Sequence, residues 1–349
     1  FQGILKNMQE RPDYSKFIER LKMSEDETRV ESTKKRHSKK YRTARENLNH
    51  LVDEDSFLEF GQFAVAAQRT RREKEDLILN TNADGVITGF CKINSDISKK
   101  MNTDAVAIVY DYSVLAGTQG LFHHQKLDRI FEKAKTYKLP IVIFTEGGGG
   151  RPGDVDVLTQ IAGMHIPSFA NWASLHKECL RIAITNGYCF AGNAALFGAS
   201  DIRIATKGSN IGMAGPAMIE GGGLGKFSPD DIGAVEDHLL NGVVDVLVEN
   251  EEQATNIAKK ILSYFQGSVD RFDSLDQELL KDILPADRRF SYEIRDVIEV
   301  VADLDSFIEL KKGYGKSLVT GLIRVEGIAF GLLASDCKFL GAFRLYSTR

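Results

Sequence analysis

The stretch that most limits how this chain can fold runs from residue 186 to residue 194 and reads NGYCFAGNA. A buried strand is expected at residues 180–185 before it, and an apolar helical pattern and a second strand, residues 200–205, follow it. Small residues at a strand-to-helix bend let a ligand approach the main chain, and the first N–H groups of the helix stay unpaired. These donors and the positive end of the helix dipole suit an oxygen that becomes negative during a reaction.

A second bend of the same kind lies upstream. An expected strand, residues 139–145, runs into Glu146 and then into a glycine-rich segment, residues 147–153. Two strand exits that can each offer backbone N–H groups indicate chemistry on a carbonyl group. The alternative is that small residues only give clearance to a helix packed tightly on its strand.

Strands and crossover helices alternate along the chain. Apolar runs predict strands at residues 86–93 and 104–110, and apolar residues at helical spacing predict helices at residues 120–138 and 254–265. This alternation predicts an α/β fold rather than a sandwich or a helical bundle.

Composition excludes several classes of protein. A formal net charge of −4 over 349 residues gives no argument for nucleic acid or an anionic membrane as partner. The cysteines at positions 91, 179, 189 and 337 form no close pair, which argues against a zinc ribbon or a disulfide scaffold. No apolar run reaches membrane-spanning length. We expect a cytoplasmic protein, or one of the mitochondrial matrix if a transit peptide has been lost together with the natural start, because residues 1–3 resemble the remnant of a cleaved tag.

A basic run between residues 29 and 45 carries eight arginines and lysines. It fits either an anion-binding arm or a solvated helix that packs on another part of an assembly. Aromatic residues are not interleaved with the charges, so base stacking has little support.

An internal repeat connects the two ends of the chain. Residues 53–60, DEDSFLEF, recur as DLDSFIEL at residues 303–310, and a β-rich segment follows each copy. We interpret the repeat as a duplicated domain whose second copy has only begun. The expected organisation is a tag remnant and arm at residues 1–30, a first domain at 31–266, a linker at 267–290 and a truncated second domain at 291–349.

Five motifs in a common order carry a family resemblance. They are Thr43-Ala44-Arg45-Glu46 with residues 53–59; residues 110–114 with Ala116-Gly117-Thr118-Gln119-Gly120 and Lys126; Gly147 to Arg151; Gly233-Ala234 with His238 and Gly242-Val243; and Tyr292 with residues 295–298. Over residues 36–342 the chain resembles the carboxyltransferase component of biotin-dependent acyl-CoA carboxylases, in the crotonase superfamily.

The resemblance implies a crotonase-like (ClpP/crotonase) ββα spiral domain that transfers a carboxyl group from carboxybiotin to the α-carbon of an acyl-CoA. It implies biotin on a carrier partner, a biotin carboxylase component and a homo-oligomer between a dimer and a hexamer, and no metal, nucleic acid or membrane. For the enolate oxygen we expect N–H groups of Ala191 and Gly192, with Gly148 and Gly149 as further donors. The expected acyl-CoA-binding residues are Ala116, Gly117, Gly120, Lys126, Gly147, Gly150 and Arg151.

Three departures from the family pattern and two rivals stay open. In the family the second domain, of which this chain has only the start, binds the biotin side of the reaction, which implies that the chain can be inactive alone. Glu146 stands where relatives usually have Ser or Asp, and Ala191-Gly192 stands where many have two glycines. A crotonase-type acyl-CoA hydratase or isomerase would need acid–base carboxylates near the bends, for which Glu146 and Glu220 are distant candidates. The other rival is a non-catalytic scaffold subunit. Adjacent His123 and His124 point in different directions on a helix, which disfavours joint metal ligation.

Overall fold

The computed structural model describes residues 11–156, 166–287 and 289–339. The expected tag remnant at residues 1–3 and the tail at residues 343–349 lie outside the described residues.

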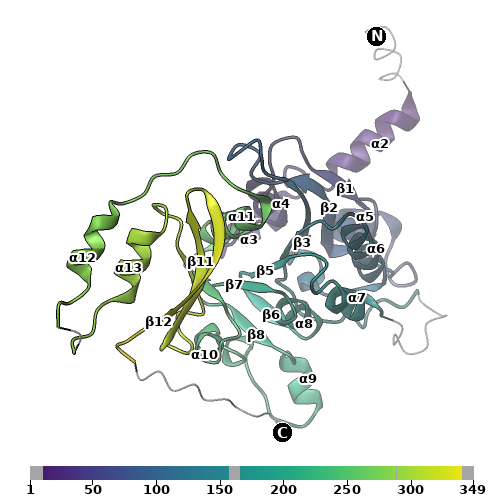
Figure 1. Cartoon of the computed structure of the whole chain (residues 1–349). Coiled ribbons are helices and arrows are strands. Elements are labelled where there is room, and N and C mark those ends of the chain that lie inside the picture. The colour runs from purple at the N-terminus through teal and green to yellow at the C-terminus, as the bar shows by residue number, and fades with distance from the viewer. Residues whose placement is uncertain (1–10, 157–165, 288, 340–349) are drawn as a thin grey trace.

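Within these residues the centre of the molecule is a seven-stranded sheet of order β1-β2-β3-β4-β5-β7-β9 (Figure 1). The first three strands are antiparallel, and every pairing from β3 onward is parallel. The strands are β1 (Leu58–Phe60), β2 (Val86–Lys92), β3 (Asp104–Tyr110), β4 (Ile141–Phe144), β5 (Arg181–Thr185), β7 (Ile202–Thr206) and β9 (Val246–Val248). The predicted α/β fold is confirmed.

Helices cover both faces of this sheet. Successive side chains of a strand point to opposite faces of the sheet. In β3 the apolar side chains on both faces are buried. Val106 and Ile108 pack into one apolar core beneath α6, whereas Ala107 and Val109 pack into a second core beneath α4 and α11. This double burial explains why the strand is a nearly unbroken apolar run in the sequence.

The two helices predicted at residues 120–138 and 254–265 are confirmed as α6 and α11, with bounds close to those expected. The described helices are α2 (Pro12–Lys22), α3 (Val30–Ser38), α4 (Ala44–Leu51), α5 (Lys74–Asn80), α6 (Leu121–Tyr137), α7 (Ser168–Ser174), α8 (Gly192–Gly198), α9 (Pro216–Gly221), α10 (Val235–Leu240), α11 (Glu251–Gln266), α12 (Leu280–Ile283) and α13 (Ile294–Val301). A short parallel pair, β6 (Tyr188–Phe190) and β8 (Asn210–Gly212), lies beside the main sheet.

The sequence repeat corresponds to a repeated local structure. In the first copy α4 leads into β1 and the antiparallel strands β2 and β3; in the second, α13 leads into β10 (Ile308–Leu310), β11 (Leu318–Val325) and β12 (Ile328–Ser335). Arg45 of α4 pairs with Glu59 of β1 at 2.7 Å, and Arg295 of α13 pairs with Glu309 of β10 at 2.5 Å. Figure 1 shows the second unit on the opposite side of the molecule from α6. That it begins a full second domain stays a prediction.

The basic run near the N-terminus is not the solvated helix that one interpretation predicted. Its arginines reach inward to largely buried carboxylates: Arg29 to Asp111 at 2.5 Å and Arg36 to Glu146 at 2.7 Å. Asp111 directly follows β3, and Glu146 lies two residues after β4. The arm therefore packs against the carboxyl ends of the central strands of its own domain.

Within residues 11–156, 166–287 and 289–339, no helix combines the length and the apolar content needed to cross a membrane. Within the same ranges there is no group of three or more His, Cys, Asp or Glu side chains placed to hold a metal ion.

Candidate functional site

The two glycine-rich bends meet at the carboxyl edge of the sheet. An isolated β-bridge joins Gly147 to Cys189, so the chain leaving β4 runs beside β6. A second bridge joins Gln119, from the segment after β3, to Gly150. Three segments that are far apart in the sequence therefore converge where the sequence predicted a site.

A buried asparagine fastens these segments together. The Asn193 amide, in the first turn of α8, donates to the Thr145 carbonyl at 3.2 Å and to the Gly117 carbonyl at 3.4 Å. Its side-chain oxygen accepts from the Gly149 N–H at 3.1 Å. Asn193 is fully buried, so each of these contacts is made away from water.

Three of the four expected oxyanion donors are already engaged, which corrects the prediction from the sequence. Ala191 N–H donates to the Gly212 carbonyl at 2.8 Å and Gly148 N–H to the Ala116 carbonyl at 2.9 Å. Gly149 N–H donates to Asn193. These amides stabilise the bends themselves, since a buried N–H group needs a partner.

Two amides of the bends remain available. Among the described residues, neither Gly192 N–H nor Gly150 N–H has a hydrogen-bond partner. Gly192 is the first residue of α8, where the missing partner follows from helix geometry. In the Gln119–Gly150 bridge the bonds are made by the amides of Gln119 and Arg151, at 2.7 and 3.0 Å, which leaves the Gly150 amide unpaired.

Glycines of the two bends and of the segment after β3 are also needed for close packing. A Cβ on Gly147 would overlap the Asn193 amide and the Gly117 carbonyl, and a Cβ on Gly192 would overlap the Gln119 side chain. Gly117, at φ +62°, lies against the Glu146 carbonyl, and Gly120 lies against Asp154. The clearance that the sequence left as an alternative is thus a real requirement, and it coexists with the two unpaired amides.

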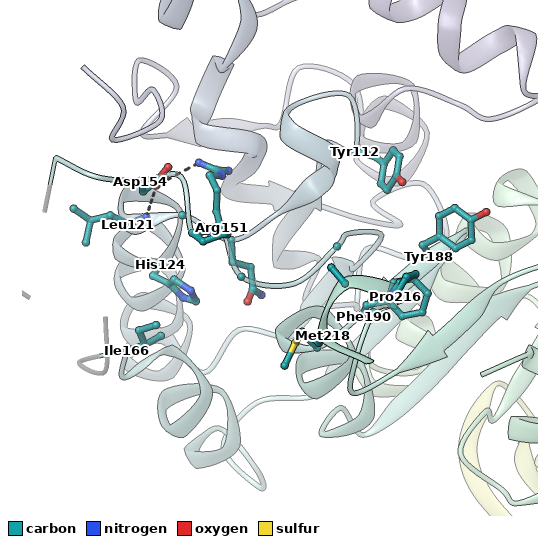
Figure 2. A pocket seen from close by; sticks show the side chains of 18 of the residues that line it. Tyr112, Leu121, His124, Arg151, Asp154, Ile166, Tyr188, Phe190, Pro216 and Met218 are labelled. Carbon is teal, nitrogen blue, oxygen red and sulfur yellow. Dashed lines mark hydrogen bonds and ion pairs between the residues drawn. The ribbon is translucent and has the colours of Figure 1, made fainter. Parts of the chain in front are cut away.

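A cavity of about 990 Å³ opens beside the bends (Figure 2). Gly148, Gly150 and Ala191 form part of its wall. Figure 2 shows Leu121, His124 and Ile166 on one side and Tyr112, Tyr188 and Phe190 on the other. Its volume lies at the upper end of the roughly 300–1,000 Å³ typical of ligand pockets, and its lining is mostly apolar with a few polar groups.

Two expected acyl-CoA-binding side chains are used elsewhere. Lys126 is only 8% exposed, and its ammonium donates to the carbonyls of Ala83, at 2.7 Å, and Val86. Burial lowers the pKa of Lys126 to about 8. This ammonium faces main-chain carbonyls rather than solvent, the opposite of what a partner for a CoA phosphate needs.

Arg151 lies at the edge of the cavity, but its guanidinium is paired inside the protein. It forms an ion pair with the fully buried Asp84 and donates to the Thr118 carbonyl at 2.6 Å. The buried ion pair holds the glycine bend against the turn before β2, and the contact with Thr118 holds it against the segment after β3. Arg151 is thus placed as a structural residue of the site.

The adjacent histidines have separate environments, as expected. His123 is fully buried, and its Nδ1 contacts the Asp84 carbonyl at 3.1 Å; burial lowers its pKa well below the usual range. His124 faces the cavity, with Nδ1 3.0 Å from the Ser168 hydroxyl. Burial lowers the pKa of His124 to about 4, so both rings are neutral at pH 7.

The carboxylates considered for acid–base chemistry already have ion-pair or hydrogen-bond partners. Glu146 pairs with Arg36, and Glu220 is half exposed and pairs with Lys226 at 2.9 Å; neither lines the cavity. Asp154 does line it, but accepts from the Leu121 N–H at 3.0 Å and so caps α6. Asp128 also lines the cavity and accepts from the Asn171 amide at 3.0 Å. Among the described residues, the cavity lining therefore offers no free pair of carboxylates of the kind that a hydratase or isomerase would use.

Comparison with known families decides what this arrangement is. Residues 35–346 match the carboxyl transferase domain. This chain belongs to the carboxyl transferase family. The match includes both bends, the segment after β3 and the second repeat unit.

Relatives of this carboxyl transferase are named as acyl-CoA enzymes. The 12S subunit of methylmalonyl-CoA carboxyltransferase from Propionibacterium freudenreichii subsp. shermanii is 32% identical over 89% of this chain and 58% of that protein. The alpha subunit of methylmalonyl-CoA decarboxylase from Veillonella parvula is 26% identical over 93% of this chain and 62% of that protein. The carboxyl transferase chain described here spans just over half the length of these curated relatives.

Two solved structures confirm the predicted fold. A single-chain, multi-domain long-chain acyl-CoA carboxylase is 46% identical with a TM-score of 0.91, over 95% of this chain and 33% of that one. Transcarboxylase 12S, a hexamer with methylmalonyl-CoA and methylmalonic acid bound, is 30% identical with a TM-score of 0.73, over 88% of this chain and 60% of that one. The crotonase-like α/β fold of carboxyltransferases is thereby shown for this carboxyl transferase.

Sequence reasoning missed the residues that hold the bends in place. Asn193 directly follows Ala191-Gly192, and the sequence assigns it no role. Gln119 belongs to a family motif, but its contact with the glycine-rich bend, like that of Asp84 with Arg151, joins residues that are distant in sequence. The sequence contains one signal of a buried side chain that needs hydrogen-bond partners. Asn193 is polar, whereas its neighbours in the helix are all apolar.

Proposed function

We propose that this carboxyl transferase binds an acyl-CoA in the cavity and stabilises the enolate of its thioester while a carboxyl group is added to the α-carbon. The amides of Gly192 and Gly150 are the donors to the enolate oxygen. The family resemblance assigns the carboxyl group, and the acceptor of the α-proton, to carboxybiotin on a carrier domain. This chain's own residues are assigned to the acyl-CoA alone.

The observation that carries the proposal is the pair of unpaired amides: Gly150 lines the apolar cavity, and Gly192 directly follows Ala191, which also lines it. Each well-aimed donor to a developing oxyanion contributes about 3–4 kcal/mol of transition-state stabilisation. The amides of Ala191, Gly148 and Gly149 are held by hydrogen bonds, which fixes the main chain beside the two free donors before charge develops.

We propose further that the acyl group is long. The solved structure with 46% identity is a long-chain acyl-CoA carboxylase. The cavity wall offers apolar side chains at both ends, from Leu121 and Ile166 to Phe190 and Pro216. Each buried methylene contributes roughly 0.8 kcal/mol, so affinity should rise with chain length until the cavity is filled.

The test uses transfer in the reverse direction. A carboxylated acyl-CoA and free biotin are incubated with the protein, and the decarboxylated acyl-CoA is measured by liquid chromatography. In this direction the α-carbon–carboxyl bond breaks and the carboxyl group is transferred to the biotin nitrogen, while the proton that this nitrogen loses is added to the α-carbon. We expect biotin-dependent turnover that rises from two-carbon to long acyl groups.

The same preparation separates the rivals. Hydration of an enoyl-CoA without biotin would identify a hydratase, and no turnover by a folded protein that still binds its carrier partner would identify a scaffold subunit. Equal turnover across all acyl lengths would contradict the long-chain proposal while leaving carboxyl transfer in place.

A further inference from the structure

A buried ion pair connects the N-terminal helix to the base of both bends. Arg36 of α3 makes a two-pronged contact with Glu146: its two terminal nitrogens lie 3.0 and 2.7 Å from the two carboxylate oxygens. The Arg36 side chain is 11% exposed and that of Glu146 is 7% exposed. Forked contacts of this kind fix orientation as well as distance.

Glu146 occupies a position from which it can set the geometry of both bends. Its own backbone leads directly into Gly147, the first residue of the glycine-rich bend. Its carboxylate also accepts from the Asn186 amide at 3.2 Å, and Asn186 begins the segment that leads to the second bend. A Cβ on Gly187 would lie 3.1 Å from the Glu146 carboxyl carbon, so the second bend is folded closely around this carboxylate.

Arg36 reaches the cavity wall as well. Its guanidinium lies 4.8 Å from the Tyr41 ring and 5.6 Å from the ring of Tyr112, which lines the cavity. Its Nε donates to the Arg42 carbonyl at 3.0 Å. Every nitrogen of the guanidinium is therefore in use, and one side chain links α3, the cavity wall and the glycine-rich bend.

The charges around this pair make it sensitive to substitution. A second carboxylate, Glu251 at the start of α11, lies 3.9 Å from Arg36 and accepts from the Asn186 amide at 3.0 Å. One guanidinium thus faces two buried carboxylates. Burial, and after it the nearby Glu251, raise the pKa of the Glu146 carboxyl, while Arg36 opposes the rise.

We propose that Arg36 and Glu146 are positioning residues, which fix the spacing of the two bends and so the directions of the Gly192 and Gly150 amides. Neither touches the reacting atoms. The effect on turnover rests on the proposed function, whereas the effect on the bends does not. A misplacement of about 1 Å in such a site costs up to about a hundredfold in rate.

The molecule contains a matched control. Arg45 and Glu59 form an ion pair of 2.7 Å whose side chains are each 9% exposed, and Arg45 also belongs to the N-terminal helices. That pair joins α4 to β1 and makes no contact with either bend. Glu59→Gln therefore removes an equally buried charge on the same side of the fold without loosening the bends.

The experiment compares Glu146→Gln with Glu59→Gln in the full chain by hydrogen–deuterium exchange and by steady-state kinetics. In Glu146→Gln we expect about tenfold faster exchange in peptides covering residues 147–151 and 187–192, because their local opening becomes easier. We expect kcat to fall by about 10–100-fold with little change in the KM for acyl-CoA. In Glu59→Gln both bends and kcat should stay within about twofold of the wild type.

Each outcome decides the proposal. Equal exchange at the bends in the two variants, or an equal fall in kcat, would show that the Arg36–Glu146 pair is only one more structural ion pair. Faster exchange in Glu146→Gln alone would support the positioning role. If the protein also transfers no carboxyl group, the proposed function would be contradicted while the positioning role remains supported. If Glu146→Gln does not fold, Arg36→Lys against Arg45→Lys makes the same comparison, since lysine keeps the charge and loses the forked contact.

Discussion

The two bends of the site look alike in the sequence and differ in how their amides are used. The bend after β4 contains four consecutive glycines, and the amides of Gly147, Gly148 and Gly149 all have partners. The bend after β6 contains a single glycine, and it begins a helix whose first amide, that of Gly192, has no partner among the described residues. The richer glycine run therefore offers one free donor, Gly150, and the poorer one offers the other.

A glycine-rich segment therefore indicates close packing of the main chain more directly than it indicates unpaired N–H donors. Gly147 and Gly149 leave room for Asn193 and Ala191, and their own amides complete the local hydrogen bonds. A helix N-terminus leaves an amide unpaired for a geometric reason that does not depend on glycine.

Removing the helix amide should have the largest effect. Gly192→Pro deletes the donor at a position where helices accept proline. We expect kcat for carboxyl transfer to fall by about 10²–10³-fold, the loss measured for one oxyanion donor elsewhere. Acyl-CoA affinity, measured by calorimetry, should change by much less.

The control for steric change is Gly192→Ala. It keeps the N–H and adds a Cβ that meets Gln119 and lies 2.8 Å from the Phe169 ring. Its loss of kcat should be clearly smaller than that of Gly192→Pro. Equal losses would assign the effect to crowding of Gln119 rather than to the missing donor.

The bend after β4 offers a cleaner pair of variants. A Cβ on Gly150 would meet nothing within 4 Å, so Gly150→Ala should leave kcat nearly unchanged. Gly150→Pro removes the amide, and we expect about a hundredfold lower kcat. If both variants keep full activity, the Gly150 amide has no part in the reaction and the donor must be sought on the other bend alone.

Removing the side chain that joins the two bends should lower the stability of the fold more than it lowers the rate of the reaction. Asn193→Ala leaves the Gly149 N–H and the Thr145 carbonyl without their partner in a buried place, at about 1–3 kcal/mol for each unsatisfied group. Chemical denaturation should show a fall of about 2–4 kcal/mol in the free energy of unfolding. An unchanged midpoint would mean that the bends do not depend on this side chain.

The smallest effect is expected where the bend is strained. Ala191 has φ 51° and ψ −118°, a conformation that costs a non-glycine residue about 1–3 kcal/mol. Ala191→Gly should raise the free energy of unfolding by about 1 kcal/mol after the extra chain entropy is counted, without loss of kcat. A lower thermal midpoint in this variant would show that the Ala191 side chain contributes packing that outweighs the strain.

The sequence predicted the α/β fold and the two bends because both depend on periodic or local patterns. The apolar run at β3, the helical spacing in α6 and the small residues at both strand exits each reflect burial or close approach at one position. The repeat was visible for the same reason: the structure places Phe57 against Gly89 and Phe307 against Gly321, so both copies need the same residue types.

The state of each amide and of each charged side chain could not be predicted in this way. Whether Ala191 N–H is free depends on the Gly212 carbonyl, which is brought alongside by the pairing of β6 with β8. The family motif and the flexible ammonium predict Lys126 as a partner for a CoA phosphate, but its ammonium contacts the carbonyls of Ala83 and Val86 instead. Such long-range partners are fixed only by the complete fold.

The most direct test follows the thioester carbonyl itself. An acyl-CoA labelled with ¹³C at the thioester carbon is bound to the wild-type protein and to Gly192→Pro, and the carbonyl stretching band is recorded by infrared difference spectroscopy. The account predicts a shift to lower frequency in the wild type that is largely lost in the variant, since only a hydrogen-bonded carbonyl is polarised in this way. A wild-type band at the frequency of the free thioester, with acyl-CoA bound, would contradict the account.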